Sequence, residues 1–141
     1  MSVSQSAIDE VTEVLEVVGP AVLLVHSAAG GVGFAIASER PELLHALVVI
    51  EPTGCPEDAA SAPSVPFLAL YGDRVGERGQ AGRLGACQTI RDLVESAGIA
   101  AALLSYPDLG VAGNTHLMMQ DDNNDLLLDD VVTWLQDNVW P

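Results

Sequence analysis

Four short apolar runs alternate along the chain with stretches of helical character, and this alternation restricts the possible folds more than any other feature. The runs cover residues 21–25, 47–50, 66–71 and 99–106. A short, nearly continuous apolar run is typical of a strand that is buried on both faces of a parallel sheet. Strands that alternate with helices predict an α/β fold: a mostly parallel sheet of about four strands with flanking helices on both faces.

Helices are predicted at residues 7–18, 32–38, 86–97 and 125–139. In the first, apolar residues recur at helical spacing while acids fill the other face. Ser6 is expected to cap this helix, and Asn124 to cap the last one. Residues 55–65 read as a loop, and residues 76–85, with four glycines, as a mobile connection. The residues expected to face the core in the last two helices are Ile90, Leu93, Val94, Leu127, Val131, Trp134 and Leu135.

Length and charge exclude several classes of protein. A chain of 141 residues fits a single domain, residues 1–141. Its net charge is −15, and its five basic residues are all arginines. This balance disfavours nucleic acid and anionic membranes as partners, because phosphate groups bind to basic surfaces. No apolar run is long enough to cross a bilayer.

The two cysteines and the acidic segments give no sign of a metal site. Cys55 and Cys87 match neither a CxxC motif nor the spacing of metal ligands, so we expect free thiols in a reducing compartment. Residues 121–125 are acidic but lack the glycine and glutamate that an EF-hand loop requires. The first six residues have no basic region and no apolar core, so no signal peptide is predicted. A cytoplasmic location and the absence of metal and cofactor are therefore expected.

A tight turn of small residues follows the first apolar run, from His26 to Gly31. It lies where α/β proteins bind ligands, at the carboxyl end of a parallel strand. One chemistry that uses such a turn is a nucleophile elbow with Ser27 at its apex, which exposes the serine hydroxyl above the sheet. Ala29 supplies the small residue that the crowded turn needs, whereas Val25 stands where glycine is usual.

The same turn allows a second interpretation. Residues 28–33 resemble the glycine-rich dinucleotide loop of medium-chain quinone reductases, and Glu51 lies near the place of a ribose-binding acid. Ile36 stands where the third glycine of the GxGxxG pattern belongs. A Rossmann-like NAD(P)-binding module therefore remains an alternative.

A serine hydrolase also needs a histidine to accept the serine proton and an acid to orient that histidine. Among the three histidines, His116 alone follows the fourth apolar run, which ends at the same sheet edge as Ser27. Glu51, at the end of the second run, is the better candidate for the acid. Asp73 comes too early in its turn and is expected to brace the loop, and Val75 stands where many such hydrolases have their acid.

Four segments together resemble the α/β-hydrolase superfamily, in particular its esterases whose acid is a glutamate. The segments are residues 26–27, 49–54, 66–73 and 113–121. The resemblance implies that Ser27 is the nucleophile, His116 the general base and Glu51 the orienting acid. It also implies that the Ala28 N–H is one oxyanion donor. The residues assigned to the substrate pocket are His26, Leu117 and Met118.

Such esterases are about twice as long, so the chain resembles only the C-terminal half of the fold, from the nucleophile elbow onward. The function expected is a serine hydrolase, like a carboxylesterase, that cleaves small soluble esters through an acyl-enzyme. A hydrolase remnant that acts as a non-catalytic assembly module is an alternative. The strand from Ala21 to Val25 would form an exposed apolar edge, so a homodimer or larger homo-oligomer is expected through that edge.

Overall fold

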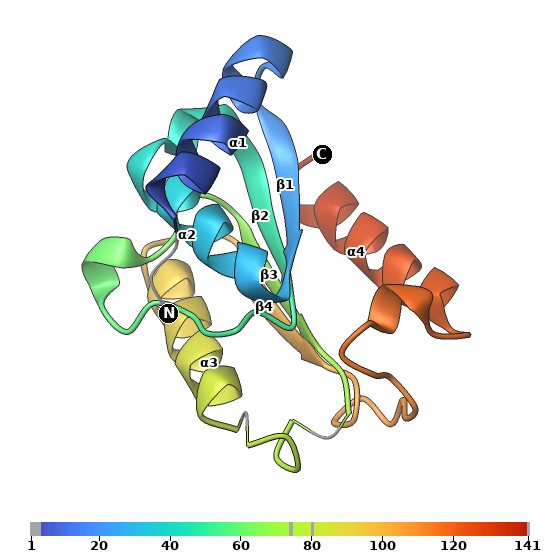
Figure 1. Ribbon diagram of the computed structural model, residues 1–141. Coiled ribbons are helices and arrows are strands. Elements are labelled where there is room, and N and C mark those ends of the chain that lie inside the picture. The colour runs from blue at the N-terminus through green and yellow to red at the C-terminus, as the bar shows by residue number, and fades with distance from the viewer. Residues whose placement is uncertain (1–3, 74, 80, 141) are drawn as a thin grey trace.

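The computed structural model describes residues 4–73, 75–79 and 81–140, and its regular elements alternate as predicted (Figure 1). In chain order the helices and strands are α1 (Gln5–Val18), β1 (Ala21–His26), α2 (Gly30–Glu39), β2 (Leu44–Ile50), β3 (Phe67–Tyr71), α3 (Ala81–Ser96), β4 (Ala101–Ser105) and α4 (Asn124–Asn138). Short 3-10 turns lie at Ser27–Ala29, Pro41–Leu43, Ala59–Ser61 and Met118–Gln120. No helix among these described residues is long and apolar enough to cross a membrane.

The four strands form one parallel sheet in the order β1-β2-β3-β4. Helices α1, α2 and α3 cover one face and α4 covers the other (Figure 1). The predicted α/β fold with helices on both faces is therefore confirmed. In such a sheet all strands end at the same edge, which brings the segments after β1, β2, β3 and β4 together.

Three helix predictions need correction. Ser4 is the residue that precedes α1, while Ser6 lies inside the helix and donates a hydrogen bond to Glu10. Asn124 is the first residue of α4, preceded by Asn123 at the cap position. Helix α3 begins at Ala81, because its two glycines are tolerated in a helix that packs on the sheet. Of the connection predicted to be mobile, residue 80 lies outside the described part of the chain.

The core confirms most of the predicted inward residues. Ile90, Val94, Leu127, Val131 and Leu135 are buried, and Trp134 packs partly buried against the α4 side of the core. Leu93 is 37% exposed, so its predicted inward position is wrong. It lies on the side of α3 that faces away from the sheet.

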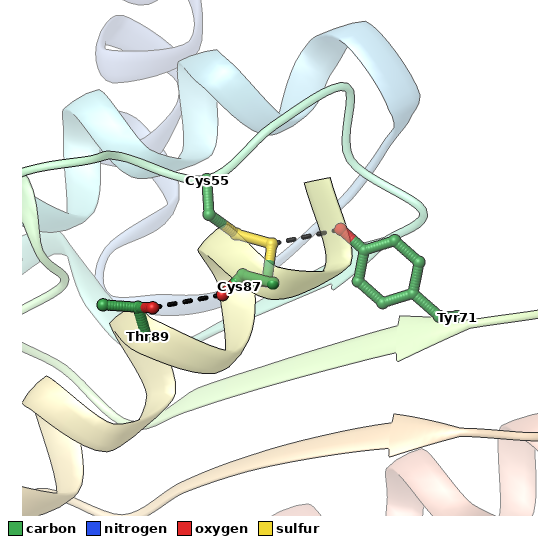
Figure 2. The surroundings of a disulfide bond; sticks show 5 residues. Cys55, Tyr71, Cys87 and Thr89 are labelled. Atoms are coloured by element: carbon green, nitrogen blue, oxygen red, sulfur yellow. Dashed lines mark hydrogen bonds between the residues drawn. A yellow bond between two sulfur atoms is a disulfide. The ribbon is translucent and has the colours of Figure 1, made fainter. Parts of the chain in front are cut away.

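The prediction of two free thiols is also wrong, because Cys55 and Cys87 form a disulfide with a Cα–Cα distance of 5.0 Å. Figure 2 shows the bond linking the loop after β2 to helix α3, with the Tyr71 hydroxyl donating to Cys87 Sγ at 3.1 Å. The pairing depends on how that loop folds back over α3. The spacing of the two cysteines along the sequence gives no indication of this contact.

Candidate active site

Ser27 lies at the sharp turn between β1 and α2, with a backbone φ of 54°. A residue other than glycine in this left-handed region is uncommon and carries conformational strain. The turn is also crowded: a Cβ at Gly30 would lie 2.8 Å from Pro52 Cβ, and one at Gly33 would lie 2.7 Å from Leu47 Cδ1. Both glycines lie in α2, which packs so closely on β2 and on the segment after it that a larger residue has no room at either position.

Glu51 follows β2 directly, also with a positive φ of 42°, and is 1% exposed. One carboxylate oxygen, Oε1, accepts hydrogen bonds from the Gly72 N–H at 2.9 Å and from Arg78 Nη2 at 2.8 Å. The other oxygen, Oε2, is 2.8 Å from His116 Nδ1 and 2.7 Å from Arg78 Nη2. The buried carboxylate is thus well supplied with donors, as a charge removed from water requires.

His116 lies between Glu51 and Ser27. Its Nδ1 contacts the Glu51 carboxylate, which can only accept, so this nitrogen carries the proton. Its Nε2 is 3.0 Å from Ser27 Oγ and, in the neutral ring, accepts the hydroxyl proton. The structure therefore places the three predicted residues in one hydrogen-bonded series, with distances suited to moving a proton from the hydroxyl to the imidazole.

The loop that carries His116 is fixed on two sides. Asp73 accepts a hydrogen bond from the Gly113 N–H and donates its own N–H to the Asn114 carbonyl at 2.9 Å. The predicted bracing role of Asp73 is confirmed by these contacts. Asp121 accepts from the Thr115 N–H and hydroxyl, so this acid of the rejected calcium segment also has a loop-holding role.

His26, which was assigned to the substrate pocket, contacts His116 directly. Its Nε2–H donates to the His116 carbonyl at 2.8 Å, and the two rings lie 4.6 Å apart between centroids. We conclude that His26 supports the backbone of His116, in addition to any contact it makes with a substrate.

Two of the predicted pocket residues differ in burial. Met118 is completely buried in the core between the sheet and α4 and also lines a groove of about 250 Å³ beside β1. Leu117 is 46% exposed and does not line this groove; Met119 does. Ala28, the predicted oxyanion donor, is exposed and lines a different cavity, on the α2 side.

Arg78 was not found by sequence reasoning. It belongs to the glycine-rich connection after β3, where no recognisable motif marks it. In the structure it contacts both oxygens of Glu51 and also donates to the Asp73 carbonyl at 3.1 Å. The one available signal was composition, since few cations are present to neutralise a buried acid in this chain.

Comparison with known proteins finds similarity to a lipase and to an esterase. No protein-family model matches the chain. A curated fungal protein (strain ATCC 74256) with the name "Probable secreted lipase phiG" is 24% identical over 86% of this chain. The aligned region is 47% of that protein, so the chain spans about half the length of the curated relative it matches.

Two solved structures have the same fold. A bacterial esterase superposes with a TM-score of 0.89 and 34% sequence identity, over 99% of this chain and 45% of the esterase. NosK from Streptomyces actuosus superposes with a TM-score of 0.65 at 16% identity, over 94% of this chain and 76% of NosK, which shows likeness of fold alone. The predicted resemblance to the esterases of the α/β-hydrolase superfamily, over part of their length, is confirmed.

Proposed function

We propose that this chain, which has an α/β-hydrolase fold and resembles the esterases of that superfamily, is a serine hydrolase of small soluble carboxylic esters. The observation that carries the proposal is the series Ser27 Oγ, His116 Nε2, His116 Nδ1 and Glu51 Oε2, joined at 3.0 Å and 2.8 Å. The likeness to a bacterial esterase over nearly the whole chain supports ester hydrolysis in general. The assignment of roles to the three side chains belongs to the proposal.

In the first half of the proposed reaction, Ser27 Oγ attacks the ester carbonyl while His116 Nε2 takes the hydroxyl proton. Glu51 holds the ring and stabilises the imidazolium. The tetrahedral intermediate then breaks the bond to the alcohol oxygen, which receives the proton from His116. In the second half a water molecule gives its proton to His116 and attacks the acyl-enzyme, which releases the acid and restores Ser27.

The negative oxygen of the intermediate would be stabilised by the Ala28 N–H and by the N-terminus of α2. Among the described residues, we identify no second N–H group that would donate to this oxygen. The loss of one donor typically lowers turnover about 10²–10³-fold. We therefore expect slow hydrolysis by this chain alone, and faster hydrolysis where a further polypeptide segment supplies that donor.

We also propose that the chain associates with a second copy through β1. Among the described strands, β1 pairs only with β2, so its other edge is left without a strand. Leu24 on β1 is 50% exposed, and Val17 and Val18 of α1 are 87% and 65% exposed. An unpaired apolar edge favours pairing with another strand, and a homodimer would continue the sheet.

The predicted cytoplasmic location remains a prediction. The Cys55–Cys87 disulfide instead favours an oxidising compartment, because thiols are kept reduced in the cytosol. Secretion is part of the name of the fungal relative only.

The proposed function is tested by hydrolysis of p-nitrophenyl acetate and by labelling with a fluorophosphonate, located by mass spectrometry. We expect turnover and a label on Ser27 in the wild type, and neither in Ser27→Ala. Ser64→Ala, which changes an exposed serine in the same way, is the matched control and should behave as the wild type. Equal rates for wild type and Ser27→Ala would overturn the proposal.

The same samples decide between the alternatives. A folded protein that is inert toward both reagents would favour the non-catalytic assembly module. A thermal shift with NADPH would favour the Rossmann-like module, whereas the hydrolase proposal predicts no shift.

A further inference from the structure

A cavity of about 830 Å³ begins beside the turn that carries Ser27. Ala28 and Ala29, the two residues after Ser27, line one part of it. Thr53 also lines it, and the Thr53 N–H donates to the Ser27 carbonyl at 3.1 Å. The cavity therefore adjoins the backbone that positions the proposed nucleophile, Ser27.

Arg83 of α3 is the cation in the lining of this cavity. Three other arginines of the described chain have carboxylate partners: Arg40 with Glu16 and Glu42, Arg78 with Glu51, and Arg91 with Asp92 and Glu95. In the part of the chain that the structure describes, Arg83 forms neither a hydrogen bond nor an ion pair. This is unexpected in a protein with 20 acidic residues and 5 basic ones, where an arginine has many possible partners.

The place of Arg83 in the fold brings it to the reactive edge of the sheet. It is in the first turn of α3, and that helix begins at the sheet edge where β1, β2 and β3 end (Figure 1). The pKa of Tyr71 is raised by burial and by Glu51, and the positive charge of Arg83 opposes this rise. Arg83 therefore lies close enough to Tyr71 to act on it electrostatically.

One acid, Glu39, also lines the cavity, but from the opposite end. Glu39 is the last residue of α2, whose first residue, Gly30, lies at the reactive edge. A helix of this length rises about 15 Å from end to end. The charge of Glu39 is thus held away from the end of the cavity that carries Arg83 and Ala28.

We propose that Arg83 is a specificity-determining residue that binds a carboxylate on the substrate, so the preferred substrates are esters whose acyl chain carries a second, free carboxylate. This inference rests on the proposed ester hydrolysis at Ser27. A guanidinium without an internal partner is free to form two parallel hydrogen bonds with such a group. The acyl chain would extend from Ser27 past Ala28 into the cavity, with its carboxylate at Arg83.

The experiment compares the p-nitrophenyl monoester of adipic acid with p-nitrophenyl hexanoate, which has an acyl chain of the same length and no charge. After subtraction of spontaneous hydrolysis, we expect the wild type to have the higher kcat/KM for the adipate ester. In Arg83→Gln the ratio of the two kcat/KM values should fall about 10- to 100-fold, the range expected for hydrogen bonds to charged groups. The rate with hexanoate should change little.

Arg91→Gln is the matched control, because it removes the same charge from an ion-paired arginine further along α3. It should leave the ratio as in the wild type. A wild type that prefers hexanoate, an unchanged ratio in Arg83→Gln, or an equal fall in Arg91→Gln would overturn the role of Arg83 while ester hydrolysis stands. No turnover of either ester would overturn both proposals.

Discussion

The proposed active site has two parts that differ in how firmly they are held. Glu51 and His116 lie in a network of contacts from three loops, and the loop after Glu51 is linked to α3 by the disulfide. Ser27 is carried by β1, which has a neighbouring strand on one side and a half-exposed Leu24. The acid and base are therefore positioned by this chain itself, whereas the nucleophile depends on an edge strand. Four changes, arranged by the size of the expected effect, test this difference.

Glu51→Gln tests the firmly held part directly. The amide preserves the shape of the side chain but removes the charge that stabilises the imidazolium, so we expect kcat to fall by about 10⁴-fold, as for comparable substitutions of the triad acid. Ester hydrolysis measured at saturating substrate checks this result. Glu57→Gln, which alters an exposed acid on the same loop, is the control. A loss below tenfold would contradict the role assigned to Glu51.

Removal of the disulfide by Cys55→Ser with Cys87→Ser should destabilise the whole fold. The bond joins residues separated by 32 positions. A loop of that length predicts a loss of about 3–4 kcal/mol in the free energy of unfolding. Urea unfolding of oxidised wild type and of the double variant measures the difference. An unchanged midpoint would mean that other contacts hold the loop after β2 without the bond.

Arg78→Met tests whether the buried charge of Glu51 needs its partner. We expect kcat to fall about 10- to 100-fold with little change in KM, because an interaction worth about 1.5–3 kcal/mol with a charged group is lost. Arg78→Lys should restore part of the activity, since it keeps the charge. A purely structural role would lower the midpoint of unfolding in both variants without this rescue of kcat.

Leu24→Lys tests the weakly held part and should have the smallest effect on the folded subunit. Because the side chain is half exposed, the free energy of unfolding of the subunit should change by less than about 0.5 kcal/mol. A charge on the open edge should nevertheless prevent strand pairing between copies. Sedimentation should show an oligomer for the wild type and a monomer for Leu24→Lys; a wild-type monomer at low micromolar concentration would contradict the proposed dimer.

The same difference explains for which strands burial could be predicted from the sequence. The apolar runs at β2 and β3 predict buried strands, and both strands are buried almost throughout. The run at β1 is equally apolar, but in the structure most of its residues are only partly buried, Leu24 is exposed and Val25 alone is buried. Burial of a strand depends on its neighbours in the sheet, and a run of apolar residues carries no information about them.

The candidate site was predictable where topology determines it. Ser27, Glu51 and His116 follow strands that end at one edge, so their convergence could be expected from the order of the elements. The contact of Arg78 with Glu51 and the pairing of the cysteines arise from loops, whose paths have no periodic pattern in the sequence. Leu117 was assigned to the pocket from its position next to His116, and the exposure of a residue in such a loop cannot be predicted from the sequence.

The left-handed backbone at Ser27 has a consequence for the evolution of this chain. Glycine adopts such angles without cost, so selection for thermal robustness alone would favour the loss of this side chain. Glu51 shares the left-handed backbone, but its buried contacts with Gly72 and Arg78 would favour keeping it. A screen of random variants for heat resistance should therefore enrich glycine at position 27 and not at position 51, and the survivors should be inert toward esters.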